Sequence, residues 1–156
     1  MMRLGIIVAF IVIVLDQITK KIATTYLATE SFKIFDFLNF VLVYNKGISF
    51  SMFATQSLWG PWIFSLIAIA IVCGLFFWLK NAESKIISVS LGLLIGGAFG
   101  NVIDRVLIGA VIDFIDFHKY GFHWPAFNVA DIAIFVGVFI IVCINLFFNS
   151  KVNRSS

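Results

Sequence analysis

Long stretches without a charged residue constrain this chain more than any other feature of its sequence. Four stretches contain no Asp, Glu, Lys or Arg, namely residues 4–15, 47–79, 86–103 and 132–150. An α-helix needs about 20 apolar residues to cross the hydrocarbon core of a bilayer. We therefore predict four membrane spans, which lie near residues 4–22, 59–79, 86–105 and 128–148.

The composition of the chain agrees with residence in a membrane. Hydrophobic residues make up 62% of the 156 residues and charged residues only 12%, whereas ordinary globular proteins have about 25% charged residues. A soluble fold of this size would lack the polar side chains needed to cover its surface. We predict an all-α integral membrane bundle of four transmembrane helices that forms one domain, residues 1–156. The scattered basic residues give no reason to expect a nucleic-acid partner.

The positions of the basic residues indicate the orientation of the bundle. With four spans, both termini lie on one side, together with five basic residues beside span ends: Arg3, Lys80, Lys85, Lys151 and Arg154. Short segments rich in Lys and Arg favour the cytoplasmic side. We predict cytoplasmic termini, a first span that is retained as an anchor, and two extracytoplasmic connections near residues 23–58 and 106–127.

The first connection is unusually apolar for a loop. Residues 32–44 are rich in aromatic and β-branched side chains and alternate partly between apolar and polar, which favours short strands over a helix. Aromatic side chains also favour the membrane–water interface. We predict a small sheet that lies on the membrane surface.

Two aspartates flank the second connection. Asp113 follows the third predicted span and Asp131 begins the fourth, so both lie at the same membrane face. Two carboxyl groups that meet can share one proton, with one acting as acid and the other as base near neutral pH. That is the chemistry of an aspartic protease. A structural interpretation also stands, because Asn128 three residues before Asp131 is typical of a helix N-cap followed by an acid in the first turn.

Further polar residues lie within or beside the spans, where they are costly and call for an explanation. Asp16 and Lys20 are spaced i, i+4 and are expected to pair on one helix face. Asp104 and Arg105 end the third span, either as a local polar cluster or with Arg105 holding a substrate carbonyl. Spacing alone leaves both interpretations of Arg105 open.

Small residues recur every four positions in the last two predicted spans. Gly92, Gly96 and Gly100 form one such series, and Ala133 and Gly137 form the other. Small residues at this spacing let helices approach closely. If these two faces meet, the span ends that carry the two aspartates are drawn together.

His118 and His123 lie near Asp113 and Asp116 in the sequence, and these residue types can bind a metal ion. Zinc needs three or four converging ligands, and the chain has no HExxH or CxxC motif and no His pair at i, i+4. We expect no metal and no cofactor.

Two other classes of function compete with a protease. One is a small proton-coupled transporter, in which Asp16 and Asp131 would form a proton path. Transporters often show inverted repeats and broken spans, and neither is evident in this sequence. The other is a membrane scaffold without chemistry, which would leave the costly acids unexplained.

Five blocks of residues resemble, in order, the motifs of the lipoprotein signal peptidases, or signal peptidase II family. They are Asp16-Gln17-Ile18-Thr19-Lys20, Asn45-Lys46-Gly47-Ile48-Ser49-Phe50-Ser51, Gly100-Asn101-Val102-Ile103-Asp104-Arg105, Val111-Ile112-Asp113-Phe114 and Phe127-Asn128-Val129-Ala130-Asp131. Each block alone is a weak signal, but five in order along nearly the whole chain are strong together.

The resemblance implies a role for each matching residue. Asp113 and Asp131 match the catalytic pair, while the residues that match positions lining or supporting the site are Asn45, Gly47, Asn101, Asp104, Arg105, Asn128, Asp16 and Lys20. The family's fold is a four-helix bundle with an extracytoplasmic β-cradle and a short extracytoplasmic helix. One departure stands out, because the family usually has two small residues where this chain has Ile48-Ser49, which puts inhibitor affinity in doubt.

The resemblance also implies partners and a location. The substrate would be a prolipoprotein whose Cys carries diacylglyceryl, cut on the N-terminal side of that Cys. Membrane lipids and the cyclic peptide inhibitor globomycin would be further partners. We expect a monomer in the bacterial cytoplasmic (inner) membrane, with its active site at the extracytoplasmic face.

Overall fold

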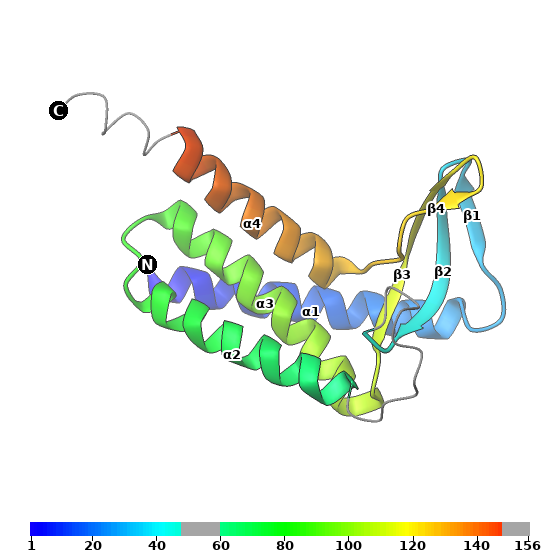
Figure 1. Ribbon diagram of the computed structural model, residues 1–156, viewed down its shortest axis with the longest axis horizontal. Coiled ribbons are helices and arrows are strands. Elements are labelled where there is room, and N and C mark those ends of the chain that lie inside the picture. The colour runs from blue at the N-terminus through cyan, green and yellow to red at the C-terminus, as the bar shows by residue number, and fades with distance from the viewer. Residues whose placement is uncertain (48–59, 148–156) are drawn as a thin grey trace.

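The computed structural model describes residues 1–47 and 60–147 as a bundle of helices with a small sheet at one end (Figure 1). The elements in chain order are α1 (Met2–Tyr26), β1 (Phe32–Phe35), β2 (Leu38–Asn45), α2 (Gly60–Lys80), α3 (Lys85–Ile108), β3 (Val111–Lys119), β4 (Phe122–His123) and α4 (Val129–Phe147). Within these residues, four helices are long and apolar enough to cross a membrane. The prediction of four such helices with a small sheet is confirmed.

The outer surface of the helices is apolar. Large apolar side chains on three helices are 67–71% exposed, namely Phe10 on α1, Leu66 and Phe77 on α2, and Phe135 on α4. Soluble monomers rarely expose large contiguous apolar patches, whereas lipid solvates such side chains. The chain is therefore a multi-pass membrane protein.

Helix α3 is the centre of the bundle and contacts each of the other three helices (Figure 1). In its most apolar stretch 61% of the residues are buried, against 17–22% in the other helices. A Cβ at Gly92 would lie 2.5 Å from the carbonyl oxygen of Gly5, and one at Gly96 would lie 2.7 Å from that of Ala9. These glycines allow the backbones of α1 and α3 to approach closely.

The condition that the two small-residue faces meet is not fulfilled at Gly92 and Gly96. The series that contains Gly92 and Gly96 faces α1, and α4 instead contacts the neighbouring face of α3, where Gly97 lies against the carbonyl oxygen of Ala130. Gly137 approaches the carbonyl oxygen of Ser90. Successive residues of a helix point about 100° apart, so Gly96 and Gly97 serve two different neighbouring helices.

Replacing Gly97 with Ala is expected to destabilise the bundle, because the new methyl group would overlap the backbone oxygen of Ala130. Overpacking of this kind costs about 1–3 kcal/mol. Thermal unfolding in detergent should show a clearly lower Tm for Gly97→Ala. Gly74→Ala in α2 is the matched control, since a Cβ there has no neighbour within 4 Å. Equal Tm values for the two variants would contradict the close α3–α4 contact.

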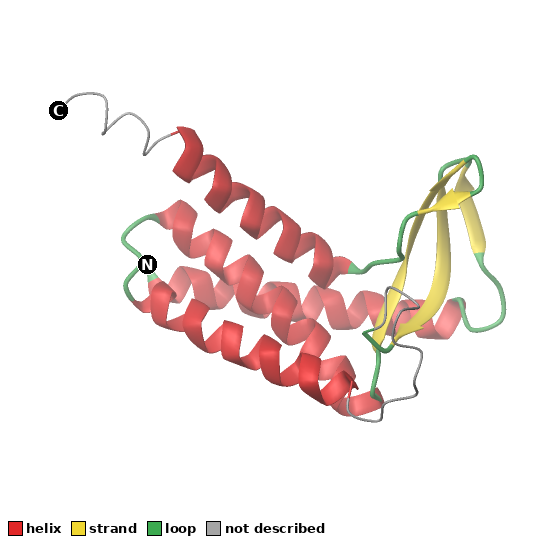
Figure 2. Cartoon of the chain, in the orientation of Figure 1, coloured by secondary structure: helices red, strands yellow, loops and turns green. Residues whose placement is uncertain are grey.

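The sheet has the strand order β1-β2-β3-β4, and each neighbouring pair is antiparallel. Figure 2 shows the strands in yellow at one end of the helices. The turn between β3 and β4 contains Tyr120 and Gly121 at φ values of 52° and 81°, as in the two-residue turns that suit the twist of a hairpin. Strands β1 and β2 confirm the prediction of short strands in residues 32–44. Strand β3, which carries Asp113, was not anticipated as a strand, although its residues are β-branched and aromatic.

The expected short helix is not found in residues 27–47 or 109–127. The remainder of the first connection, including Ile48-Ser49, lies outside the described residues. A separate short helix therefore stays a prediction.

The two ends of the bundle differ in character. The N-terminus and the α2–α3 connection lie at one end, and the sheet lies at the other (Figure 1). Arg3, Lys80 and Lys85 belong to the first end, because they stand at the start of α1, the end of α2 and the start of α3.

Candidate active site

A buried lysine joins α1 to α3 at the sheet end of the bundle. The side chain of Lys20 is 2% exposed, and its Nζ lies 2.8 Å from Asp16 Oδ2, 2.7 Å from Asp104 Oδ2 and 2.9 Å from Asn101 Oδ1. A buried ammonium group is tolerated only when it is paired and fully hydrogen-bonded. The expected pairing of Asp16 with Lys20 is confirmed, and Asp104 belongs to the same cluster.

Asp16 also fixes the start of α4. Its Oδ1 accepts a hydrogen bond of 2.9 Å from the backbone N–H of Ala130, in the first turn of that helix. Gly100 leaves room for this contact, because a Cβ there would lie 2.6 Å from Asp16 Oδ2. Helices α1, α3 and α4 are therefore held together at one level.

Gln17 is a supporting residue that the sequence analysis did not select. Its Nε2 donates to Asp104 Oδ1 at 3.0 Å and to the carbonyl oxygen of Gly100 at 3.3 Å. The available signal was an amide side chain at membrane depth beside Asp16. It bridges α1 and α3 next to the lysine cluster.

Asn128 and Asp131 cap the N-terminus of α4 reciprocally. Asn128 Oδ1 accepts the Asp131 N–H at 3.0 Å, and Asp131 Oδ2 accepts the Asn128 N–H at 3.2 Å. This is a capping box, in which two otherwise unpaired backbone donors are satisfied. The predicted N-cap is confirmed.

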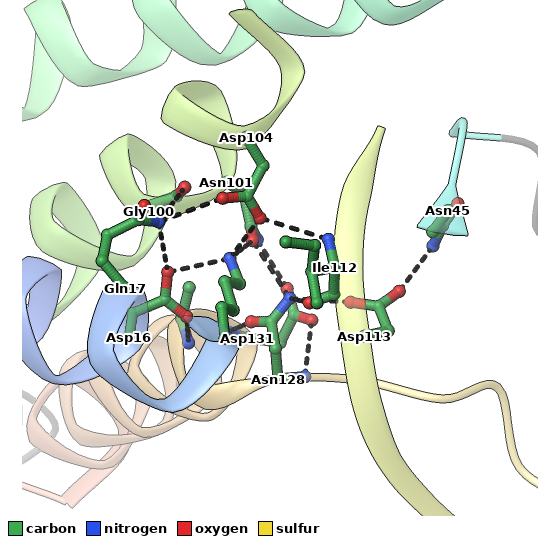
Figure 3. Close-up of polar contacts among 12 residues, drawn as sticks. Asp16, Gln17, Asn45, Gly100, Asn101, Asp104, Ile112, Asp113, Asn128 and Asp131 are labelled. Carbon is green, nitrogen blue, oxygen red and sulfur yellow. Dashed lines mark hydrogen bonds and ion pairs between the residues drawn. The ribbon is translucent and has the colours of Figure 1, made fainter. Parts of the chain in front are cut away.

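Strand β3 delivers Asp113 to the same place, where its side chain is 2% exposed. Asp113 Oδ1 accepts from Asn128 Nδ2 at 2.7 Å, and Asp113 Oδ2 accepts from Asn45 Nδ2 at 2.9 Å (Figure 3). Asn45 is oriented by the Gly47 N–H, which donates to its Oδ1 at 2.9 Å. Gly47 has a φ of 88°, a backbone conformation that favours glycine.

Two asparagines connect the two candidate aspartates. Asn101 Nδ2 donates to Asp131 Oδ1 at 2.8 Å, and Asn101 Oδ1 accepts from Asn128 Nδ2 at 3.1 Å. Asn128 in turn contacts both Asp113 and Asp131. Carboxyl groups from β3 and α4 thus belong to one network of hydrogen bonds (Figure 3).

The environment of Asp113 changes its acidity. Burial raises the pKa of Asp113 from 3.8 to about 6, and the negative charge of Asp131 adds to this rise. Hydrogen bonds from Asn45 and Asn128 and the positive charge of Lys20 oppose it. A carboxyl group with this pKa can exchange a proton near neutral pH.

Replacing Asp113 with Asn should change how stability depends on pH. In the wild type the protonated side chain favours the folded state, so its contribution is present below about pH 4 and is lost as the pH rises through about 6. Asn cannot ionise. The Tm of Asp113→Asn relative to wild type should therefore be higher at pH 7 than at pH 4.5, by an amount equivalent to at most roughly 3 kcal/mol. A constant difference across this range would contradict the raised pKa.

Arg105 is a further cation beside the carboxylates. Its charge interacts with those of Asp131, Asp113 and Asp104, and its guanidinium carbon lies 6.0 Å from the centre of the Phe64 ring. Within the described part of the chain, its buried Nε has no hydrogen-bond partner. Asp104 is instead paired with Lys20, at 2.7 Å.

A pocket of about 380 Å³ opens beside Asp113. Pockets of a few hundred Å³ are the size that commonly hold small ligands. Strand β2 and the segment before α4 supply most of its wall, and the residues that line it are Val43, Tyr44, Asn45, Lys46, Asp113, Pro125 and Ala126.

The histidines lie farther out on the sheet. His123 Nδ1 is 2.9 Å from Asp116 Oδ2, and the rings of His118 and His123 stack with their centres 5.0 Å apart. Among residues 1–47 and 60–147, no three His, Cys, Asp or Glu side chains converge as a metal site would require.

A bundle of membrane-spanning helices that holds two linked carboxyl groups beside a pocket has the features of a polytopic membrane protease. Comparison with known proteins supports this class. Residues 8–148 match the family described as signal peptidase (SPase) II. The chain is 44% identical over 137 residues to the lipoprotein signal peptidase of Janthinobacterium sp. (strain Marseille), covering 86% of this chain and 83% of the relative.

Other relatives and a solved structure agree. The lipoprotein signal peptidase of Methylobacterium radiotolerans is 36% identical over 157 residues, covering 99% of this chain and 92% of that one. A structure described as a bacterial membrane enzyme, determined by the in meso method at 1.9 Å, is 34% identical with a TM-score of 0.78, covering 92% of each chain. The chain belongs to the signal peptidase II family, and it is a protease of that family.

Proposed function

We propose that this chain is a membrane aspartic endopeptidase that removes signal peptides from diacylglyceryl-modified prolipoproteins, cutting on the N-terminal side of the lipidated Cys. The observation that carries the proposal is the network in which Asn128 contacts both Asp113 and Asp131 beside an open pocket. Family membership supplies the substrate class, because the relatives are lipoprotein signal peptidases.

The two carboxyl groups can divide the chemistry of amide hydrolysis between them. The ionised carboxyl takes a proton from water as the water oxygen attacks the scissile carbonyl carbon. The protonated carboxyl donates its proton to the carbonyl oxygen. The carboxyl that took the proton from water then gives it to the amine as the C–N bond breaks, and the other carboxyl regains its proton as the carbonyl group re-forms. The raised pKa of Asp113 supports a shared proton near neutral pH.

The remaining polar residues serve the pair. Asn45, Asn101 and Asn128 donate hydrogen bonds to its carboxyl oxygens. Arg105, whose charge interacts with those of Asp131 and Asp113, would hold the substrate carbonyl oxygen as negative charge develops on it. Asp16, Lys20, Asp104 and Gly47 hold these residues in place, which is a supporting role.

The active site is proposed to face the extracytoplasmic side of the bacterial cytoplasmic (inner) membrane. With Arg3, Lys80 and Lys85 at the opposite end from the sheet, the positive-inside rule favours cytoplasmic termini. The sheet would then lie at the outer surface, where Phe35 and Phe37, which are 55% and 52% exposed, can contact lipid headgroups. The protein is proposed to act as a monomer.

Purified protein in detergent or proteoliposomes should cleave a diacylglyceryl-modified prolipoprotein. Mass spectrometry of the products is expected to show the released signal peptide and a mature chain that begins with the lipidated Cys. The same precursor without diacylglyceryl is the matched control and should remain uncut. Globomycin is expected to inhibit by binding beside Asp113. No cleavage of the modified precursor, or equal cleavage of both precursors, would overturn the proposal.

The transporter alternative is not favoured. The relatives that cover most of the chain are peptidases, and the polar cluster of Asp16 and Lys20 is closed by its own hydrogen bonds.

A further inference from the structure

The orientation of two buried amide groups decides what the carboxyl pair contacts. The side-chain oxygen and nitrogen of Asn have nearly the same shape, so the surrounding donors and acceptors determine which end points where. Asn101 and Asn128 are 7% and 0% exposed, which leaves little room for water to reorient them.

Lys20 sets the orientation of Asn101. Its ammonium group can only donate hydrogen bonds, and it lies 2.9 Å from the Asn101 side chain. That end of the amide must therefore be the oxygen. The nitrogen is then directed to Asp131 Oδ1 at 2.8 Å.

The same constraint reaches Asn128. The Asn101 oxygen also accepts from Asn128 Nδ2 at 3.1 Å, and the Asp131 N–H donates to Asn128 Oδ1 at 3.0 Å. Both contacts require the Asn128 NH₂ group to face Asp113, to which it donates at 2.7 Å. The two amides thus present their donors to the two aspartates.

Each N–H donor of the Lys20 ammonium group has a partner. An ammonium group has three N–H donors, and Nζ has three partners, on Asp16, Asp104 and Asn101. Gln17 donates to the other oxygen of Asp104. The contacts with Asp104 and Asn101 join α1 to α3, whereas the contact with Asp16 lies within α1. Of these partners, Asn101 also contacts the carboxyl pair, through Asp131.

We propose that Lys20 is a positioning residue for the peptidase reaction, which fixes the Asn101 amide so that Asn101 and Asn128 keep their N–H donors on Asp131 and Asp113. This inference rests on the proposed function. Lys20 touches neither aspartate of the pair through a recorded hydrogen bond, so it acts through Asn101 rather than on the substrate.

Loss of Lys20 should also change the titration of the pair. Among the described residues, the charged groups around the pair and its pocket are Asp16 and Lys20 on α1, Lys46 after β2, Asp104 and Arg105 on α3, Asp113 on β3 and Asp131 on α4. The charge of Lys20 lowers the pKa of Asp113. Removing this charge and releasing the amide both favour the protonated carboxyl, so the pH–rate profile should move toward higher pH.

The test compares Lys20→Met with Lys20→Gln. Both variants are uncharged and similar in volume, but only Gln keeps an N–H group that can donate to Asn101 Oδ1. Lys80→Met, at the other end of the bundle, controls for loss of a lysine. The measurements are Tm, kcat, KM and the pH–rate profile on the modified prolipoprotein, with infrared titration of the Asp113 carboxyl, whose band is identified by its loss in Asp113→Asn.

We expect Lys20→Met to lower kcat by at least about 30-fold with KM within about threefold, and to shift the pH–rate profile and the Asp113 titration to higher pH. Lys20→Gln should retain at least about fivefold more kcat than Lys20→Met. An unchanged pH profile with kcat reduced only in proportion to the folded fraction, or equal kcat for the two variants, would overturn the positioning role. If Lys20→Met does not fold, Lys20→Gln is compared with wild type instead. A shift of its pH–rate profile and Asp113 titration to higher pH would support the positioning role, and unchanged curves would overturn it.

The infrared titration separates this inference from the proposed function. A shifted Asp113 titration in a protein that cleaves no prolipoprotein would uphold the role of Lys20 and reject the peptidase. Aspartate-dependent cleavage with an unshifted titration and normal kcat in Lys20→Met would uphold the peptidase and reject the role of Lys20.

Discussion

Asp113→Asn and Asp131→Asn should each lower kcat for prolipoprotein cleavage by at least about 10³-fold, while the protein remains folded. In the proposed mechanism, each substitution removes either the base that accepts a proton from water or the acid that protonates the carbonyl oxygen. An amide side chain can do neither, although it has the shape of the carboxyl group. The measurement is the initial rate of cleavage of the modified precursor by purified protein, with Tm recorded for each variant.

The chain offers a matched control for these substitutions. Asp36 lies in the turn between β1 and β2, and its side chain is 95% exposed and paired with Lys33 at 2.6 Å. Asp36→Asn removes a carboxyl group from the same sheet without touching the site, and it should cleave at the wild-type rate. Near-normal cleavage by either Asp113→Asn or Asp131→Asn would exclude the aspartic mechanism.

The helices were predictable from the sequence because lipid imposes a local rule. A span must be apolar over its whole length, so the positions of charges mark its ends. The exact residue at which each helix ends was harder to predict, as α3 shows. It continues to Ile108, beyond the predicted end near residue 105, and stops where Gly109 adopts a left-handed conformation with a φ of 73°. Gly109 was the available signal for this C-cap.

Local sequence patterns did not predict strand β3 or which helix faces pack together as well as they predicted the spans. The pairing of β3 with β2, which sets Val43 opposite Asp113, joins residues far apart in the chain. Gly96 and Gly97 look alike in the sequence, but they contact different helices. Which small residue meets which neighbour depends on the arrangement of all the helices.

In the candidate site too, contacts between near neighbours in sequence were predictable and contacts between distant residues were not. The N-cap by Asn128 and the Asp16–Lys20 pair depend on near neighbours in sequence, and spacing predicted both. Asn101 on α3 contacts Lys20 on α1 and both Asn128 and Asp131 at the start of α4, so these contacts join three helices. The motif blocks indicated that these residues belong together, but the direction of each hydrogen bond required the structure.

Asn128 has two separable roles, and replacing it should reduce catalysis even when the helix cap is kept. Its Oδ1 caps α4 by accepting the Asp131 N–H, while its Nδ2 donates to Asp113 Oδ1. Ser at this position can still cap the helix, but it is too short to replace the donor to Asp113. Ala keeps neither contact. We expect both Asn128→Ser and Asn128→Ala to lower kcat by at least about 100-fold, which is the usual effect of removing one donor from a catalytic site.

Stability should distinguish the two variants where activity does not. Loss of a cap costs about 1 kcal/mol, so Asn128→Ser should unfold at a higher temperature than Asn128→Ala in the same detergent. If Asn128→Ser instead cleaved at nearly the wild-type rate while Asn128→Ala did not, the cap would account for the whole effect of Asn128. The structure argues against that outcome, because the bond to Asp113, at 2.7 Å, is the shortest that the Asn128 side chain makes. A donor held this closely to a carboxyl of the proposed catalytic pair stabilises its ionised form, and a helix cap supplied by Ser cannot replace that effect.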